Sequence, residues 1–130
     1  MMAKISIYDY VHPVEGNLMK KWSTGLQKKE RAKLNSKIDA LALHGADLIP
    51  GILSPTGVPS IFKLRVKGQV QLRPLVCDGP GRTEPAFTFL LGAKEIASKC
   101  EPANALEKAA ELRNDLLAHP DRRTEHERVS

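Results

Sequence analysis

Residues 61–75, IFKLRVKGQVQLRPL, hold the side chains with the clearest potential for binding or catalysis. Lys63, Arg65 and Lys67 alternate with apolar residues, and Arg73 follows on the return segment after a glycine. Alternate side chains of a strand point to opposite faces of a sheet, so this pattern predicts a hairpin with one apolar and one cationic face. Arginine and lysine on such a face bind phosphate groups or are simply solvated, and the residue types leave both interpretations open.

The apolar face also predicts the register of this hairpin. Continuity of that face requires Val66 to pair with Val70, with residues 67–69 as the turn. Lys63 then lies directly opposite Arg73, and two opposed cations repel each other. A site built to bind an anion tolerates this repulsion, and the residues still leave the phosphate-binding and the solvated interpretation open.

The segments on either side of the hairpin predict how it is held. Alternation over residues 3–11 predicts a first strand, and apolar residues at helical spacing predict a short helix before Gly25 and a longer one over 28–44. A further apolar strand is expected over 86–93, and Pro102 begins a last helix. We therefore expect an α+β fold, in which a small antiparallel β-sheet has an N-terminal helical hairpin and a C-terminal helix packed on one face.

Length and composition favour one compact domain. The chain of 130 residues has 42% hydrophobic and 27% charged residues, as ordinary globular domains do. Residues 1–118 are expected to form this domain and residues 119–130 a polar tail. No apolar run is long enough for a signal peptide or a membrane span, so we expect a cytoplasmic protein without a membrane partner. The spacing of cysteine and histidine does not suit a metal site, and no metal or cofactor is expected.

Basic residues are concentrated in the predicted second helix. The formal charge of the chain is +5, which favours an anionic partner. Lys28, Lys29 and Lys33 lie in this helix, and Glu30 is the one acid between residues 20 and 37. Lysines on the polar face of a helix are either solvated or bind an anion such as nucleic acid.

The order of short motifs along residues 20–117 resembles the RelE/HigB toxin superfamily, including its phage-derived members. A tryptophan precedes a basic helix, a glycine follows the helix, and two strands carry arginines. A short apolar strand, a lysine-rich connector over 94–101, a proline and a last helix complete the order. The landmarks in this chain are Trp22, Gly45, Leu64-Arg65, Arg73, Phe89 to Leu91, Lys94, Lys99 and Pro102.

The resemblance implies a toxin of a type II toxin–antitoxin system that cleaves mRNA on the ribosome and is neutralised by a cognate antitoxin. Such a metal-independent endoribonuclease activates the RNA 2′-OH to attack the adjacent phosphate. On this mapping Arg73 stabilises the transition state and Arg65 holds the phosphate. Lys94 and Lys99 line the rim, and the chain offers only Glu95, Lys94 or the distant histidines where a proton-transfer residue is expected. The RNA-binding candidates are Lys63, Lys67, Lys99, Lys28, Lys29 and Lys33.

The alternative interpretation is the same scaffold without catalysis. The strand that ends at residues 91–93 has no histidine or aromatic residue where many members of the superfamily carry one, and Pro74 directly follows Arg73. These departures favour a non-catalytic RelE/ParE-fold module that binds an antitoxin, nucleic acid or a gyrase-type protein target.

Overall fold

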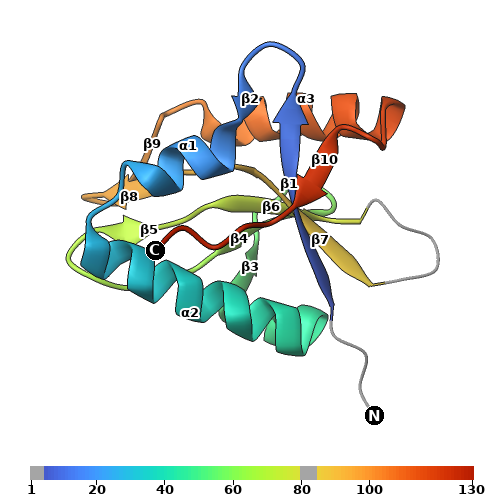
Figure 1. The fold of residues 1–130 in the computed structure, drawn as a ribbon. Coiled ribbons are helices and arrows are strands. Elements are labelled where there is room, and N and C mark those ends of the chain that lie inside the picture. The colour runs from blue at the N-terminus through green and yellow to red at the C-terminus, as the bar shows by residue number, and fades with distance from the viewer. Residues whose placement is uncertain (1–4, 80–84) are drawn as a thin grey trace.

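The computed structural model describes residues 5–79 and 85–130 (Figure 1). The strands are β1 (Ser6–His12), β2 (Gly16–Asn17), β3 (Leu53–Pro55), β4 (Ile61–Leu64), β5 (Gln71–Leu72), β6 (Leu75–Asp78), β7 (Ala86–Leu91), β8 (Lys94–Ile96), β9 (Lys99–Glu101) and β10 (Arg123–Glu125). The helices are α1 (Leu18–Thr24), α2 (Lys28–His44) and α3 (Ala105–Ala118), with a short 3-10 helix, η1 (Gly45–Leu48). None of the described helices has the length and apolar content needed to cross a membrane.

The expected fold class is wrong in its sheet and in the placement of its helices. Among the described residues the main sheet has seven strands, in the order β10-β1-β7-β6-β4-β3 with β2 beside β1. It is mixed, because β1 and β7 run parallel while the other pairs are antiparallel. A second sheet, β5-β8-β9, takes in the 94–101 segment that we expected to be a connector. The chain also enters the main sheet through β1 before it reaches the helices, so no helical hairpin begins the fold.

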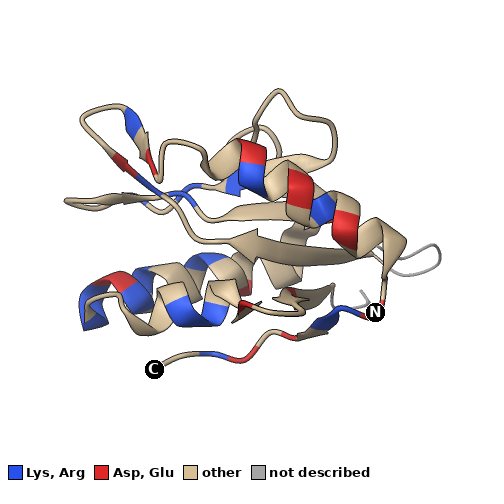
Figure 2. Ribbon diagram, turned by 90° about the horizontal axis from the view of Figure 1, so that it is seen from above, with Lys and Arg blue, Asp and Glu red and all other residues tan. Residues whose placement is uncertain are grey.

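Helices cover both faces of the main sheet, where we expected them on one (Figure 2). Leu64 of β4 and Val76 of β6 pack in one core cluster with Leu34 of α2. The alternate residues of the same strands, among them Ile61, pack in a second cluster with Leu112 of α3. Both faces of β4 and β6 therefore carry buried apolar residues, and each face needs its own cover.

The hairpin register also differs from the predicted one. Lys63 pairs with Leu75, and Val66 forms a bridge with Leu72 rather than with Val70. The connection between them is therefore residues 67–71. Because the shift is of two residues, every side chain stays on its predicted face and the apolar face is kept. The same shift means that Lys63 no longer lies directly opposite Arg73.

The C-terminal segment is part of the sheet. Residues 119–130 were expected to be a polar tail, but β10 within them pairs antiparallel with β1. Beyond it, Nδ1 of His126 lies 2.8 Å from Oδ1 of Asp9, a carboxylate that is 1% exposed. Backbone pairing at a sheet edge requires no apolar pattern, so the polar sequence of this segment did not reveal the strand.

The ends of α2 are fixed by the sequence around them. Gln27 and Glu30 form a reciprocal capping box at its start. Gly45 ends the helix with a φ of +52°, and a Cβ atom at this position would collide with the side chain of Ile5. The predicted helix over 28–44 is confirmed, and its orientation across the sheet is what positions the candidate site.

Candidate nucleic-acid interface

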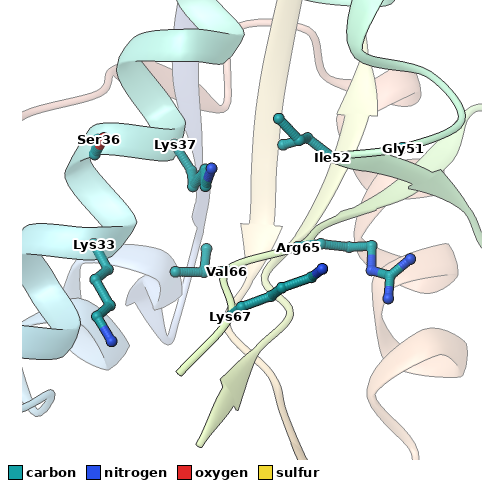
Figure 3. A pocket seen from close by; sticks show the side chains of 8 residues that line it. All are labelled: Lys33, Ser36, Lys37, Gly51, Ile52, Arg65, Val66 and Lys67. Atoms are coloured by element: carbon teal, nitrogen blue, oxygen red, sulfur yellow. The ribbon is translucent and has the colours of Figure 1, made fainter. Parts of the chain in front are cut away.

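A cationic cavity lies between α2 and the end of β4 (Figure 3). It encloses about 530 Å³. Lysines of the helix line one side of it, and an arginine and a lysine from the segment after β4 line the other, with side chains that extend away from the helix (Figure 3). The lining residues are Lys33, Ser36, Lys37, Gly51, Ile52, Arg65, Val66 and Lys67.

A second hollow, of about 330 Å³, adjoins the first along Lys33, Val66 and Lys67. It adds Lys29 from the first turns of α2, together with residues 68–70 and 72. We call the two hollows together the basic groove. Its cationic residues are Lys29, Lys33, Lys37, Arg65 and Lys67.

The cations of the basic groove have no carboxylate partner among the described residues. Within residues 5–79 and 85–130 none of them takes part in an ion pair. Glu30 is the one acid in the described lining, and its Oε1 accepts a hydrogen bond of 3.0 Å from the Gln27 backbone N–H as part of the helix cap. Lys33, Arg65 and Lys67 are exposed. Unneutralised cations from separate elements that face one concave surface are typical of a site for an extended anion.

Local structure explains why these side chains meet. Lys29, Lys33 and Lys37 are four residues apart and share one face of α2, because the helix advances one turn in 3.6 residues. On the other side, the backbone N–H of Arg65 donates to the Ile52 carbonyl at 2.7 Å, which extends the pairing of β3 and β4 by one step. The groove therefore forms where a basic helix runs along the end of a sheet.

Arg73 does not lie in the groove. It is 4% exposed, and its guanidinium donates to the carbonyls of Leu72 at 2.8 Å and Val66 at 3.4 Å. Its Nη2 also donates to Oε1 of Gln71 at 2.9 Å. Burial lowers the pKa of Arg73, a nearby Glu95 raises it, and Arg65 lowers it. The open cationic face that we expected is covered at this point by the second sheet.

The carboxylate of Glu95 forms an ion pair with both Arg73 and Lys63. Its Oε1 lies 3.3 Å from Nζ of Lys63 and 3.6 Å from Nε of Arg73. The pairing of β5 with β8, which sets Gln71 opposite Glu95, brings the carboxylate to this position. We call Lys63, Gln71, Arg73 and Glu95 the Glu95 cluster.

The predicted site residues are thus divided. Arg65, Lys67, Lys29 and Lys33 meet in the basic groove, whereas Lys63, Arg73 and Glu95 form the separate cluster. The other three predicted residues lie at neither place: these are Lys28 in the first turn of α2, Lys94 on β8 and Lys99 on β9.

Lys37 is a groove residue that the sequence-based prediction missed. Its signal was present, because it stands four residues after Lys33 on the same helix face.

The described residues contain no group of three histidine, cysteine or acidic side chains arranged to hold a metal ion. No family model, curated protein or solved structure matches the chain. The functional proposal therefore depends on the geometry of the groove and on the order of landmarks in the sequence.

Proposed function

We propose that the basic groove binds the phosphate backbone of an RNA strand. The observation that carries this proposal is that unneutralised cations of α2 and of residues 65–67 line one concave surface. Phosphate contacts by lysine and arginine supply most of the affinity of sequence-independent nucleic-acid binding. No aromatic residue lines the groove among the described residues, which favours contact with the backbone over stacking on bases.

We further propose that the protein uses this groove as the cytoplasmic toxin of a type II toxin–antitoxin system, on mRNA bound to the ribosome. The resemblance of its landmarks to RelE/HigB toxins supports RNA over other polyanions. An antitoxin that covers the groove would prevent RNA binding. The described groove lining has a single acid, Glu30, so an acidic segment of the antitoxin would complement its charge.

Cleavage would proceed by attack of the 2′-oxygen on the adjacent phosphorus. A bond from this oxygen to phosphorus forms, the bond from phosphorus to the 5′-oxygen breaks, and the proton of the 2′-OH leaves as the 5′-oxygen gains one. Charge builds on the phosphate oxygens, and Arg65 is the exposed guanidinium of the groove that suits this charge. Arg73 is buried behind the 66–72 connection, where it positions the backbone of Val66 instead.

RNA binding without cleavage is the second candidate function. Apart from Glu30, the described lining of the groove has no carboxylate, and it has no histidine or cysteine. Glu95, the predicted proton-transfer residue, is held by two cations outside the groove. A proton-transfer residue must be within hydrogen-bond reach of the proton that it moves, and this arrangement favours a binding module.

The test combines cleavage and binding for three proteins: the parent, Arg65→Gln and the control Lys28→Gln. Lys28 is an exposed lysine of α2 outside the groove lining. We expect the parent to cut mRNA on translating ribosomes and leave 2′,3′-cyclic phosphate ends. The Arg65→Gln variant should cut at least about 100-fold more slowly, because a transition-state donor is lost. The Lys28→Gln variant should behave like the parent.

Each result separates the candidates. A parent that binds unstructured RNA, loses affinity on Arg65→Gln and cuts nothing would establish the binding module and reject the endoribonuclease. A parent that neither binds nor cuts RNA would reject both. Equal cleavage by all three proteins would remove Arg65 from the reaction.

A further inference from the structure

The Glu95 cluster lies beside the basic groove on the same run of backbone. Lys63 and Arg65 are two residues apart on the strand that leads into the groove, and the charge of Arg65 influences Arg73. Arg73 also holds the carbonyl of Val66, a residue of the groove lining. Arg65 of the groove thus adjoins Lys63 and Arg73 of the cluster, and among the described residues only these last two have a carboxylate partner.

The position of the Glu95 carboxylate has the properties of an anion site. Two cations approach the same oxygen, Oε1: Lys63 from β4 and Arg73 from the segment between β5 and β6. Nε of Arg73 has no hydrogen-bond partner within the described part of the chain, because its distance of 3.6 Å to Oε1 is too long for a hydrogen bond. A buried N–H without a partner is costly, so the site is incompletely satisfied by the carboxylate. A phosphate group has more acceptor oxygens and a larger charge than a carboxylate.

Glu95 belongs to a lightly attached element. The β8–β9 hairpin pairs with the rest of the chain through Gln71 and Leu72 of β5. All three residues of β9 are exposed, and Ile96 at the end of β8 is 50% exposed. The Glu95 side chain is itself 28% exposed, so the carboxylate position is open to solvent. Few buried contacts and an exposed hairpin characterise a segment that opens at low free-energy cost.

We propose that Lys63 and Arg73 form a phosphate subsite that Glu95 occupies in the free protein. The phosphate that displaces the carboxylate is the neighbour of the one bound at Arg65, which rests on the proposed RNA-binding function. Glu95 thus acts as an internal competitor of RNA. Removing such a competitor increases the affinity for RNA. Removing a catalytic base would instead abolish cleavage, and removing a purely structural ion pair would change neither RNA affinity nor cleavage.

The first experiment needs no RNA. It compares the melting temperature of Glu95→Gln in inorganic phosphate with that in chloride at equal ionic strength. The control is Glu125→Gln, an exposed acid on β10 with the same change of charge, separated from β4 by three strands of the main sheet. Phosphate should raise the melting temperature of Glu95→Gln by about 3 °C more than that of the control, because it binds only the folded protein.

The second experiment measures affinity for an unstructured RNA oligonucleotide. At low salt Glu95→Gln should bind about 3- to 10-fold more tightly than the parent, and its affinity should fall more steeply with salt because one more phosphate is neutralised. The Glu125→Gln control should gain less than about 2-fold. Adding Lys63→Gln to Glu95→Gln should abolish both the phosphate effect and the gain in RNA affinity.

The outcomes distinguish the subsite from the proposed function. A phosphate effect without any RNA binding would retain the subsite and reject the RNA-binding function. Equal responses of Glu95→Gln and Glu125→Gln in both experiments would overturn the subsite while leaving RNA binding in the groove intact. Tighter binding with lost cleavage would support the subsite and assign Glu95 a second role in the reaction.

Discussion

The basic groove and the Glu95 cluster take cations from the same short stretch, yet the two regions treat them differently. Arg65 and Lys67 of the groove are exposed and have no ion pair among the described residues. Arg73 is buried and its guanidinium donates three hydrogen bonds, and Lys63 and Arg73 both pair with the carboxylate of Glu95. The difference arises from the second sheet, which covers one end of the cationic face and leaves the other open.

Charge alone therefore does not show whether a cation is open to a partner, because a carboxylate of the same chain already occupies the cations of the Glu95 cluster. An exposed cation contributes little to folding and remains available for an anionic partner. A buried guanidinium with several acceptors contributes to the fold, and breaking its contacts leaves polar groups buried without partners. We therefore expect the two regions to respond in opposite ways to substitution.

The largest expected effect is on stability, from Arg73→Ala. The variant loses hydrogen bonds to the carbonyls of Val66 and Leu72 and leaves Glu95 with Lys63 alone. Its free energy of unfolding should fall by about 3 kcal/mol, measured by chemical denaturation. Arg65→Ala is the matched control and should stay within about 0.5 kcal/mol of the parent. A loss below about 1 kcal/mol for Arg73→Ala would contradict the expected difference between the two regions, because Arg73 would then behave as a solvated residue.

The next effect concerns binding. Lys33→Gln combined with Lys37→Gln removes two cations from one side of the groove without touching an ion pair among the described residues. Affinity for unstructured RNA should fall about 10-fold at moderate salt, because fewer phosphates are neutralised. The melting temperature should stay close to that of the parent. The control is Lys28→Gln combined with Lys99→Gln, which removes the same charge outside the groove. An equal loss of affinity in this control would mean that RNA binding depends on net charge and not on the groove.

A smaller effect is expected on the face of the sheet covered by α3. Burial, together with a hydrogen bond from its hydroxyl to Asp115, raises the pKa of Tyr10 above its ordinary value of 10.0. The folded protein therefore holds this proton more tightly than the unfolded chain. The resulting stability is present below pH 10 and is lost as the pH rises above that value.

Alkaline denaturation measures this effect. Above pH 10 the free energy of unfolding of the parent should fall by about 1 kcal/mol per pH unit more steeply than that of Tyr10→Phe. Tyr8→Phe, on the same strand, should keep the steep dependence. Parallel curves for the parent and Tyr10→Phe would show that this contact contributes nothing. That result would weaken the view that buried polar contacts of this face carry stability while groove residues do not.

Sequence patterns predicted individual elements better than their arrangement. The helix over 28–44 is confirmed, and both of its signals in the sequence, apolar periodicity and Gly45 at its end, agree on it. Alternation placed Leu64 and Val66 on a buried face, which is also confirmed. The register failed because a shift of two residues preserves the same alternation. The β10 strand was missed because pairing at the edge involves backbone groups and leaves no apolar pattern in residues 119–130.

The site was predictable only in part for a related reason. Lysines four residues apart on a helix mark a common face, and that face does line the groove. The burial of Arg73 depends on Glu95 and on the β5–β8 pairing, a contact between segments about twenty residues apart. No local pattern around Arg73 reports such a contact, so alternation alone placed it on an open face.

The salt dependence of RNA binding tests the central proposal most directly. The measurement is the affinity of the parent and of Lys33→Gln/Lys37→Gln for one unstructured RNA oligonucleotide between about 50 and about 200 mM salt. If the groove neutralises about four phosphates, the logarithm of the association constant should fall with the logarithm of salt with a slope of about −3 for the parent and about −1.5 for the variant. A slope near zero for the parent, or the same slope for both proteins, would contradict the assignment of the groove as the RNA-binding site.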